Sequence, residues 1–190
     1  MVRLLDLELA VGRQLRELAY PAYLCSMCAI ASQLREVYGD LLSKEGRALA
    51  TQTVEDLRAA CASADSVVAE AAALGQRWQE LLDDPAANGP MGLFSAMVTF
   101  HLLARELAGE VRPRAALHYV DGAASQLPDP GISLPTGPQL VRDDPAEIAD
   151  EASPGVQMLR KFGEVAALAG RRHDAGLRCD PERLRSAVFG

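Results

Sequence analysis

Apolar side chains recur every three or four residues along almost the whole chain, which is the spacing of helices that bury one face. A first stripe runs from Leu4 to Leu18 and a second from Tyr20 to Tyr38. A third spans residues 50–61, behind Ser43 as an expected N-cap, and a fourth spans residues 67–81. We expect the fourth helix to begin at Ser63 or Ser66 and to end before Pro85. The pattern therefore predicts four helices ahead of residue 85.

The segment 91–108 differs from these stripes because it is apolar around most of its circumference. Leu93, Met97 and Phe100 fall within a narrow arc of the expected helix. A narrow polar edge of this helix is defined by Ser95, Thr99 and Glu106. A helix this apolar needs neighbours on several sides, so we expect it at the centre of the fold.

The remaining elements are separated by a segment rich in proline. A sixth helix is expected from Pro113 to about Gln126, and residues 127–143 contain four prolines and two glycines, which predicts a loop. A long helix should begin at Asp144-Pro145, restart or kink at Ser153-Pro154, and continue to Gly170. A short last helix is expected from Asp180 to about Phe189.

These elements predict an all-α fold, a compact single-domain bundle of seven or eight helices over residues 1–190. The pattern gives no credible strand pairs and no self-similar repeat. Composition agrees, because 49% of residues are hydrophobic and only 5% are aromatic, so small side chains are available for close helix packing.

The charge of the chain limits its partners. A formal net charge of −7 argues against the basic surface that non-specific nucleic-acid binding requires. The charge is uneven, since residues 155–190 carry seven basic and four acidic side chains. No segment reaches the roughly 18–20 apolar residues of a membrane-spanning helix, and Asp6 and Glu8 interrupt any secretory signal. We expect a cytoplasmic protein with neither a membrane nor a nucleic-acid partner.

An acidic run follows the proline-rich segment and consists of Asp143, Asp144, Glu147, Asp150 and Glu151. Carboxylates at the start of a helix are favoured by the helix dipole, which explains part of the run. The same residues would also present a negative face to a basic partner protein. The sequence leaves both interpretations open, and the second makes these five residues a candidate partner-binding site.

A search for chemistry gives one candidate pocket. No nucleophile, nucleotide-binding or zinc-hydrolase motif occurs, so we predict no catalytic residue, cofactor or metal ion. The candidate pocket would be lined by Cys28, Met97, His101 and Arg105, with His101 as a general base or a donor to a ligand. The alternative is a partly buried histidine satisfied by a local hydrogen bond.

Cys25 and Cys28 form a CxxC pair, a pattern that is redox-active when it opens a helix after a strand. Here the pair lies within an apolar helical stripe, without a preceding strand. Cys61 and Cys179 do not complete a zinc-finger spacing. The pattern favours buried structural cysteines, with redox chemistry or metal binding as the alternative.

Three stretches occur in an order that a known group of proteins shares. They are Ala22–Cys25, Leu93–Gly109 and Asp144–Glu147. In this order they resemble small all-helical bacterial domains of unknown function and the helical immunity proteins of polymorphic toxin systems. The resemblance implies a cytoplasmic protein that works by binding another protein, and it carries over no individual functional residue.

Three functional hypotheses follow. The first is a non-enzymatic protein-binding module, in particular a toxin-neutralising immunity protein, whose partner binds the acidic run and the loop 127–143. The second is a helical enzyme or small-ligand binder with a pocket near His101. The third is a homo-oligomer, a dimer formed through an exposed part of the first two stripes.

Overall fold

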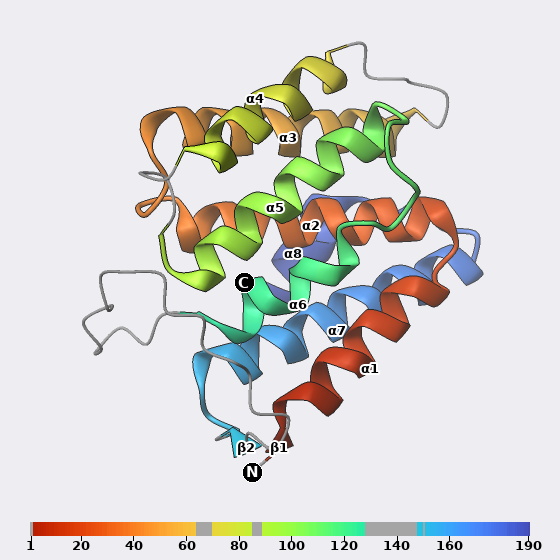
Figure 1. The fold of residues 1–190 in the computed structure, drawn as a ribbon. Coiled ribbons are helices and arrows are strands. Elements are labelled where there is room, and N and C mark those ends of the chain that lie inside the picture. Colours follow the sequence, from red (N-terminus) through yellow and green to blue (C-terminus); the bar gives the residue numbers. More distant parts are fainter. Residues whose placement is uncertain (1, 64–69, 85–88, 128–147, 150) are drawn as a thin grey trace.

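The computed structural model confirms the all-α class (Figure 1). It describes residues 2–63, 70–84, 89–127, 148–149 and 151–190. In these ranges the helices are α1 (Leu4–Glu17), α2 (Tyr20–Tyr38), α3 (Lys44–Ala62), α4 (Ala71–Asp83), α5 (Met91–Leu107), α6 (Leu117–Ser125), α7 (Pro154–Asp174) and α8 (Pro181–Phe189).

A minimal pair of strands accompanies the helices. β1 (Val2–Arg3) pairs antiparallel with β2 (Ile148–Ala149), and Val2 lies opposite Ala149. The sequence analysis expected no strand pair. Strands of two residues are too short to show the alternating pattern that predicts a strand, so this expectation was wrong for a physical reason.

The helices are stacked in layers, which Figure 1 shows from the side. α3 and α4 lie above α5 and α2, while α1, α6 and α7 form the lower part. α8 lies behind α2 and packs on both α2 and α7. One hydrophobic core runs through these layers, from Val11 in α1 to Leu184 in α8.

α5 lies in the core, as its sequence predicts, and packs against α3, α4, α6 and α2. The expected polar edge is wrong, because Ser95, Thr99 and Glu106 are all buried. Thr99 and one carboxylate oxygen of Glu106 find hydrogen-bond partners inside the protein, which offsets part of the cost of burial. The Thr99 hydroxyl, for example, donates to the carbonyl oxygen of Ser95 at 2.8 Å.

α2 shares the centre of the molecule with α5. Every residue from Ala22 to Ser32 is buried. Many of these side chains are small, which lets α3, α7 and α8 approach α2 on different sides. The sequence analysis singled out one central helix, and the structure has two.

Helix starts agree with the predicted caps where the signal is local. The Ser43 hydroxyl accepts from the backbone N–H of Gly46 at 3.0 Å at the start of α3. The Asp180 carboxylate accepts from the backbone N–H of Glu182 at 3.0 Å at the start of α8. α4 ends at Asp83, before Pro85 as predicted.

Other predicted boundaries were displaced. α6 begins at Leu117 and not at Pro113, because Arg114 takes a left-handed backbone with a φ of 71°. α7 begins at Pro154 behind the N-cap Ser153 and continues past Gly170 to Asp174. Ser63 ends α3 and does not start α4. The expected helix start at Asp144 lies outside the described residues, as do Ser66 and residues 128–143 of the predicted loop.

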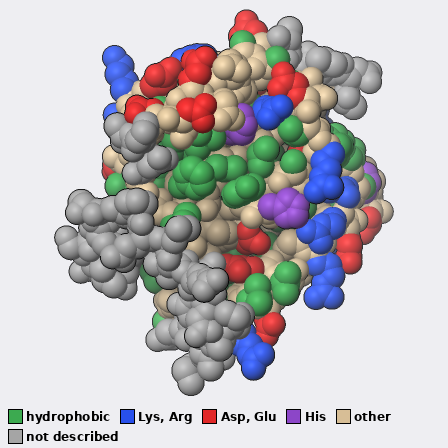
Figure 2. Space-filling view, in the orientation of Figure 1, with side chains coloured by type: hydrophobic (Ala, Val, Ile, Leu, Met, Phe, Trp, Pro, Cys, Tyr) green, Lys and Arg blue, Asp and Glu red, His purple; other side chains and the backbone are tan. Residues whose placement is uncertain are grey.

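The surface shown in Figure 2 carries hydrophobic side chains near its middle, over α5, with charged side chains toward the edges. A hollow of about 290 Å³ is lined there by apolar residues, among them Leu41, Leu93 and Met97. Within the described ranges, no helix combines the length and the apolar character needed to cross a membrane.

Candidate functional site: four cysteine thiols

All four cysteines of the chain come together in one cluster. The Cys25 thiol interacts with the thiols of both Cys61 and Cys179, and the Cys28 thiol interacts with that of Cys61. None of the four forms a disulfide. Cys25 is therefore the central thiol, with two possible partners within reach.

The first half of α2, the last turn of α3 and the turn before α8 carry these thiols. Cys25 and Cys28 are three residues apart, so they share a face of α2. Cys61 lies in the last turn of α3, which packs along α2. The Cys28 sulfur also lies 3.8 Å from the carbonyl oxygen of Val54, about two turns earlier in α3.

Cys179 reaches the cluster through a tight turn after α7. Gly176 takes a left-handed backbone, with a φ of 66°, and the N–H of Leu177 donates to the carbonyl oxygen of Arg172 at 2.9 Å. This geometry ends α7 and turns the chain back. The Asp180 cap then starts α8 directly after Cys179, and the buried side chain of Leu184 anchors that helix in the core.

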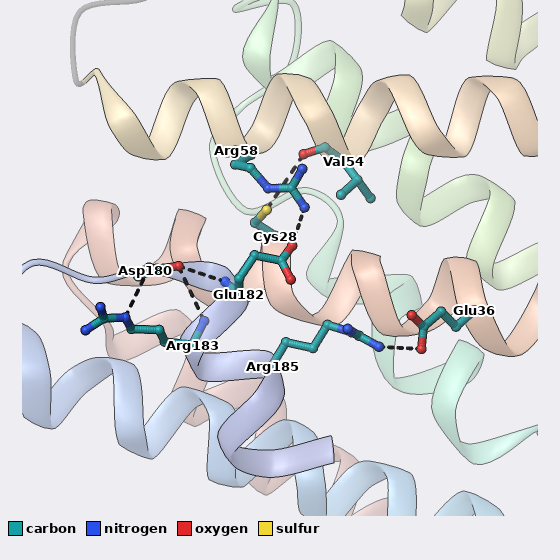
Figure 3. A network of polar contacts seen from close by, with 8 residues as sticks. All are labelled: Cys28, Glu36, Val54, Arg58, Asp180, Glu182, Arg183 and Arg185. Carbon is teal, nitrogen blue, oxygen red and sulfur yellow. Dashed lines mark hydrogen bonds and ion pairs between the residues drawn. The ribbon is translucent and has the colours of Figure 1, made fainter. Parts of the chain in front are cut away.

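Ion pairs join α8 to its neighbours around the thiols (Figure 3). Arg58 of α3 pairs with Glu182, and Arg185 pairs with Glu36 of α2. Figure 3 shows the Cys28 sulfur between α2 and α3, close to the Arg58 side chain. Both pairs are partly exposed and add little to stability. The pair with Glu182 orients the Arg58 side chain beside the cluster.

A pocket of about 420 Å³ opens beside the two outer thiols, Cys61 and Cys179. Both outer cysteines are half-buried, whereas Cys25 and Cys28 are fully buried. The charged residues that line the pocket are Arg58, Arg172, Arg178, Arg183 and Asp180. The cluster thus has two accessible thiols in basic surroundings and two thiols in the core.

Cys61 is the thiol most favoured in its ionised form. Hydrogen bonds from Cys25 and then from Cys28 lower the pKa of Cys61, and the charge of Arg58 acts in the same direction against burial. The C-terminal end of α3 opposes a negative charge by about 0.3–1 kcal/mol. One hydrogen bond to a charged group is worth about 1.5–3 kcal/mol, so the thiolate remains favoured.

Among the other three thiols, the pKa of Cys179 is also lowered and the pKa values of Cys25 and Cys28 are raised. A hydrogen bond from Cys25 lowers the pKa of Cys179 against burial, and Arg172 contributes to the shift. The pKa of Cys25 is raised by its hydrogen bonds to Cys179 and Cys61 and by burial. The pKa of Cys28 is raised by its hydrogen bond to Cys61 and by burial. The inner thiols therefore hold their protons more tightly than free thiols do, and the outer thiols lose theirs more readily.

Such an arrangement suits thiol–disulfide chemistry. An accessible thiolate is the nucleophile that such reactions need, and a second thiol within reach can complete the exchange. Among the residues that the structure describes, no group of three or more His, Cys, Asp or Glu side chains has an arrangement that could hold a metal ion.

The CxxC pair is visible in the sequence, but the cluster of four thiols is not. The expected burial of Cys25 and Cys28 is found in the structure. Zinc-finger spacing does not reveal contacts between distant segments, so it gave no sign that Cys61 and Cys179 lie beside this pair. The available signal was compositional, since a chain with only four cysteines places two of them one helical turn apart.

The predicted acidic site is mostly untested. Asp143, Asp144, Glu147 and Asp150 lie outside the described residues. Glu151 is exposed and pairs with Arg160 of α7 at 3.0 Å. A partner surface at this acidic run stays a prediction from the sequence.

The four residues of the predicted pocket have different surroundings. Cys28 belongs to the thiol cluster, Met97 lines the apolar hollow, and Arg105 pairs with Glu110 at 3.0 Å. His101 is only 6% exposed, and its Nδ1 lies 3.0 Å from the carbonyl oxygen of Gly75. The hollow lined by Met97 does not have the other three among its lining residues. A pocket shared by all four stays a prediction.

A second buried polar cluster surrounds Glu106 at the end of α5. Its Oε2 accepts from the Tyr23 hydroxyl at 3.1 Å and from the backbone N–H of Arg114 at 2.9 Å. Its Oε1 is buried without a partner in the described structure. Burial raises the pKa of Glu106 in spite of these hydrogen bonds. Burial, with Glu106 nearby, also raises the pKa of Tyr20 to about 12.

Comparison with known proteins finds no match among protein-family models, curated proteins or solved structures.

Proposed function

We propose that the protein carries out thiol–disulfide exchange, with Cys61 as the attacking thiolate and Cys25 as the second thiol. The observation that carries the proposal is the convergence of four free thiols from distant parts of the chain, two of them lining one pocket. Cys28 supports the reaction by helping Cys25 to lower the pKa of the Cys61 thiol.

The reaction proceeds in two steps. The Cys61 thiolate first attacks one sulfur of an external disulfide, forms a mixed disulfide and releases a thiolate that takes a proton from solvent. The Cys25 thiol then attacks the Cys61 sulfur and gives up its proton. A Cys25–Cys61 disulfide forms, and the second external sulfur leaves and takes up a proton. Two protein thiols are oxidised, and one external disulfide is reduced to two thiols.

The pocket supports a disulfide as the reactant. Its volume of about 420 Å³ falls in the range of small-molecule sites, about 300–1,000 Å³, and leaves room for the group attached to the attacked sulfur. The four free thiols also suit a reducing compartment, and the cytoplasm is the location that the sequence predicts.

The test is to treat the reduced protein with neutral bis(2-hydroxyethyl) disulfide and to map the products by mass spectrometry. We expect a Cys25–Cys61 disulfide. In the Cys25→Ser variant, a mixed disulfide should accumulate on Cys61, because the thiol that releases it is missing. The Cys61→Ser variant should react far more slowly.

The Cys28→Ser variant is the matched control, because it removes a neighbouring buried thiol and keeps both reacting ones. It should form the same disulfide, at a lower rate. A Cys25–Cys179 product in the wild type, or an unmodified Cys61 in the Cys25→Ser variant, would overturn the assignment. Circular dichroism of each variant checks that the fold is kept.

A further inference from the structure

We infer that the pocket beside Cys61 binds the carboxylate group of an anionic small-molecule disulfide. This inference rests on the proposed function and goes beyond it by naming the class of substrate. It is carried by the charge and the hydrogen bonds of the pocket residues.

The lining of the pocket is strongly basic. Four arginines line it, and Asp180 is the one acidic residue among its described lining residues. Three of the arginines come from the C-terminal segment that carries the excess of basic side chains, and Arg58 comes from α3. The basic character is thus formed by two separate parts of the chain.

Two of the four arginines already have acidic partners. Arg58 pairs with Glu182, and Arg183 lies 3.5 Å from Asp180. In the described part of the chain, no carboxylate pairs with Arg172 or Arg178. Two positive charges at the pocket are therefore not neutralised by the protein residues that the structure describes.

Arg172 also has an unused donor. Its Nη2 donates to the carbonyl oxygen of Arg178 at 3.1 Å, whereas its Nε is buried and lacks an acceptor among the described residues. A buried donor without an acceptor is costly and uncommon in proteins. An anionic oxygen in the pocket would supply that acceptor.

A carboxylate on a short aliphatic chain fits these surroundings. Guanidinium groups bind carboxylates with two parallel hydrogen bonds, which makes them selective for this group. The remaining lining includes the apolar side chains of Ala62, Leu177 and Pro181, which can cover an aliphatic chain. A carboxylate held by Arg172 and Arg178 would then leave the attached sulfur facing Cys61.

The test compares three disulfides of similar size and different charge. They are 3,3′-dithiodipropionate, bis(2-hydroxyethyl) disulfide and cystamine, each normalised to its rate with a small free thiol. We expect the anionic compound to oxidise the protein about tenfold faster than the neutral one. This ratio corresponds to the strength of about one charge-assisted hydrogen bond at an exposed site. The cationic compound should be the slowest, and added salt should reduce these differences.

Arg178→Gln should lower the rate with the anionic disulfide about tenfold and so remove the preference for the anion. Arg171→Gln is the matched control, because Arg171 is an exposed arginine of α7 that does not line the pocket. Equal normalised rates for all three disulfides, or a loss of preference in both variants, would overturn the inference and leave the exchange reaction standing.

A binding measurement separates the inference from the reaction. The thioether 3,3′-thiodipropionate carries the same carboxylates but cannot exchange, and calorimetry on the Cys61→Ser variant should show binding that Arg178→Gln abolishes. If this compound binds while no disulfide reacts with the wild type, the anion site stands and the exchange reaction falls. If it does not bind, the inference falls.

Discussion

Glu106 is a carboxylic acid that the fold keeps away from water, and it is 6% exposed. Tyr23 and Arg114 donate to one of its oxygens, and the other oxygen has no described partner. An uncharged carboxyl group suits such a place better than a carboxylate. The raised pKa of Glu106 expresses that preference.

This preference predicts a dependence of stability on pH. A raised pKa in the folded state means that folded Glu106 holds its proton more tightly than the unfolded chain does. Its stabilising contribution is then complete below about pH 4.3, the value of an unfolded glutamate, and is lost as the pH rises through the folded pKa. We expect Glu106→Gln to remove this loss, because the amide oxygen still accepts from Tyr23 and Arg114.

The melting temperature, measured from about pH 4 to about pH 8, checks this prediction. Relative to the wild type, the Glu106→Gln variant should gain stability as the pH rises. Glu110→Gln is the control, because Glu110 is exposed and pairs with Arg105 at the surface. The same pH dependence in Glu106→Gln and the wild type would count against the buried-acid interpretation.

Helices were predicted well from the sequence where the information is local. Caps such as Ser43 and Asp180 act within three residues, and both were found at the expected helix starts. The start of α6 was missed because the backbone of Arg114 is held by distant groups. Its guanidinium donates to the carbonyl oxygens of Arg16 and Leu18, which lie 98 and 96 residues earlier in the sequence.

Packing between helices predicts opposite effects for two glycines. A Cβ at Gly92 of α5 would collide with the carbonyl oxygen of Gln126 and with the Tyr38 hydroxyl, whereas a Cβ at Gly12 of α1 would meet nothing. We expect Gly92→Ala to destabilise the protein by about 1–3 kcal/mol through overpacking. Gly12→Ala should stabilise it by about 0.5–1 kcal/mol, because alanine favours helix.

Urea denaturation, followed by circular dichroism and by the fluorescence of Trp78, measures both glycine variants. Trp78 is buried and its ring stacks on that of Phe100, with ring centres 5.4 Å apart, so unfolding should change its emission. If the Gly92→Ala variant has the same free energy of unfolding as the wild type, α5 can shift away from α6 at little cost.

At the scale of the whole molecule, the thiol cluster was the feature that the sequence did not reveal. Helical spacing shows which face of α2 carries Cys25 and Cys28, and it shows that the face is buried. It does not show which helices cover that face, because helix pairing depends on side-chain packing throughout the core. The all-α class and the burial of α5 were predictable because both follow from the spacing of apolar residues.

Oxidation of the cluster should stabilise the whole fold. A Cys25–Cys61 disulfide would close a loop that contains most of α2 and nearly all of α3. Such a cross-link restricts the unfolded chain and is worth about 3–4 kcal/mol for a loop of this length. The urea midpoint of the oxidised protein should exceed that of the reduced protein, and Cys61→Ser should remove the difference. A lower midpoint after oxidation would mean that the disulfide distorts the helices.

The gathering of every cysteine in one cluster also gives the protein a built-in chemical probe. No sulfhydryl group elsewhere in the chain contributes background, so any thiol reagent reports on this one place. The half-buried outer pair should be labelled in the folded state, and the buried inner pair only after the helices separate. Counting labelled thiols over time would therefore follow the opening of α2, α3 and α8 without any engineered reporter.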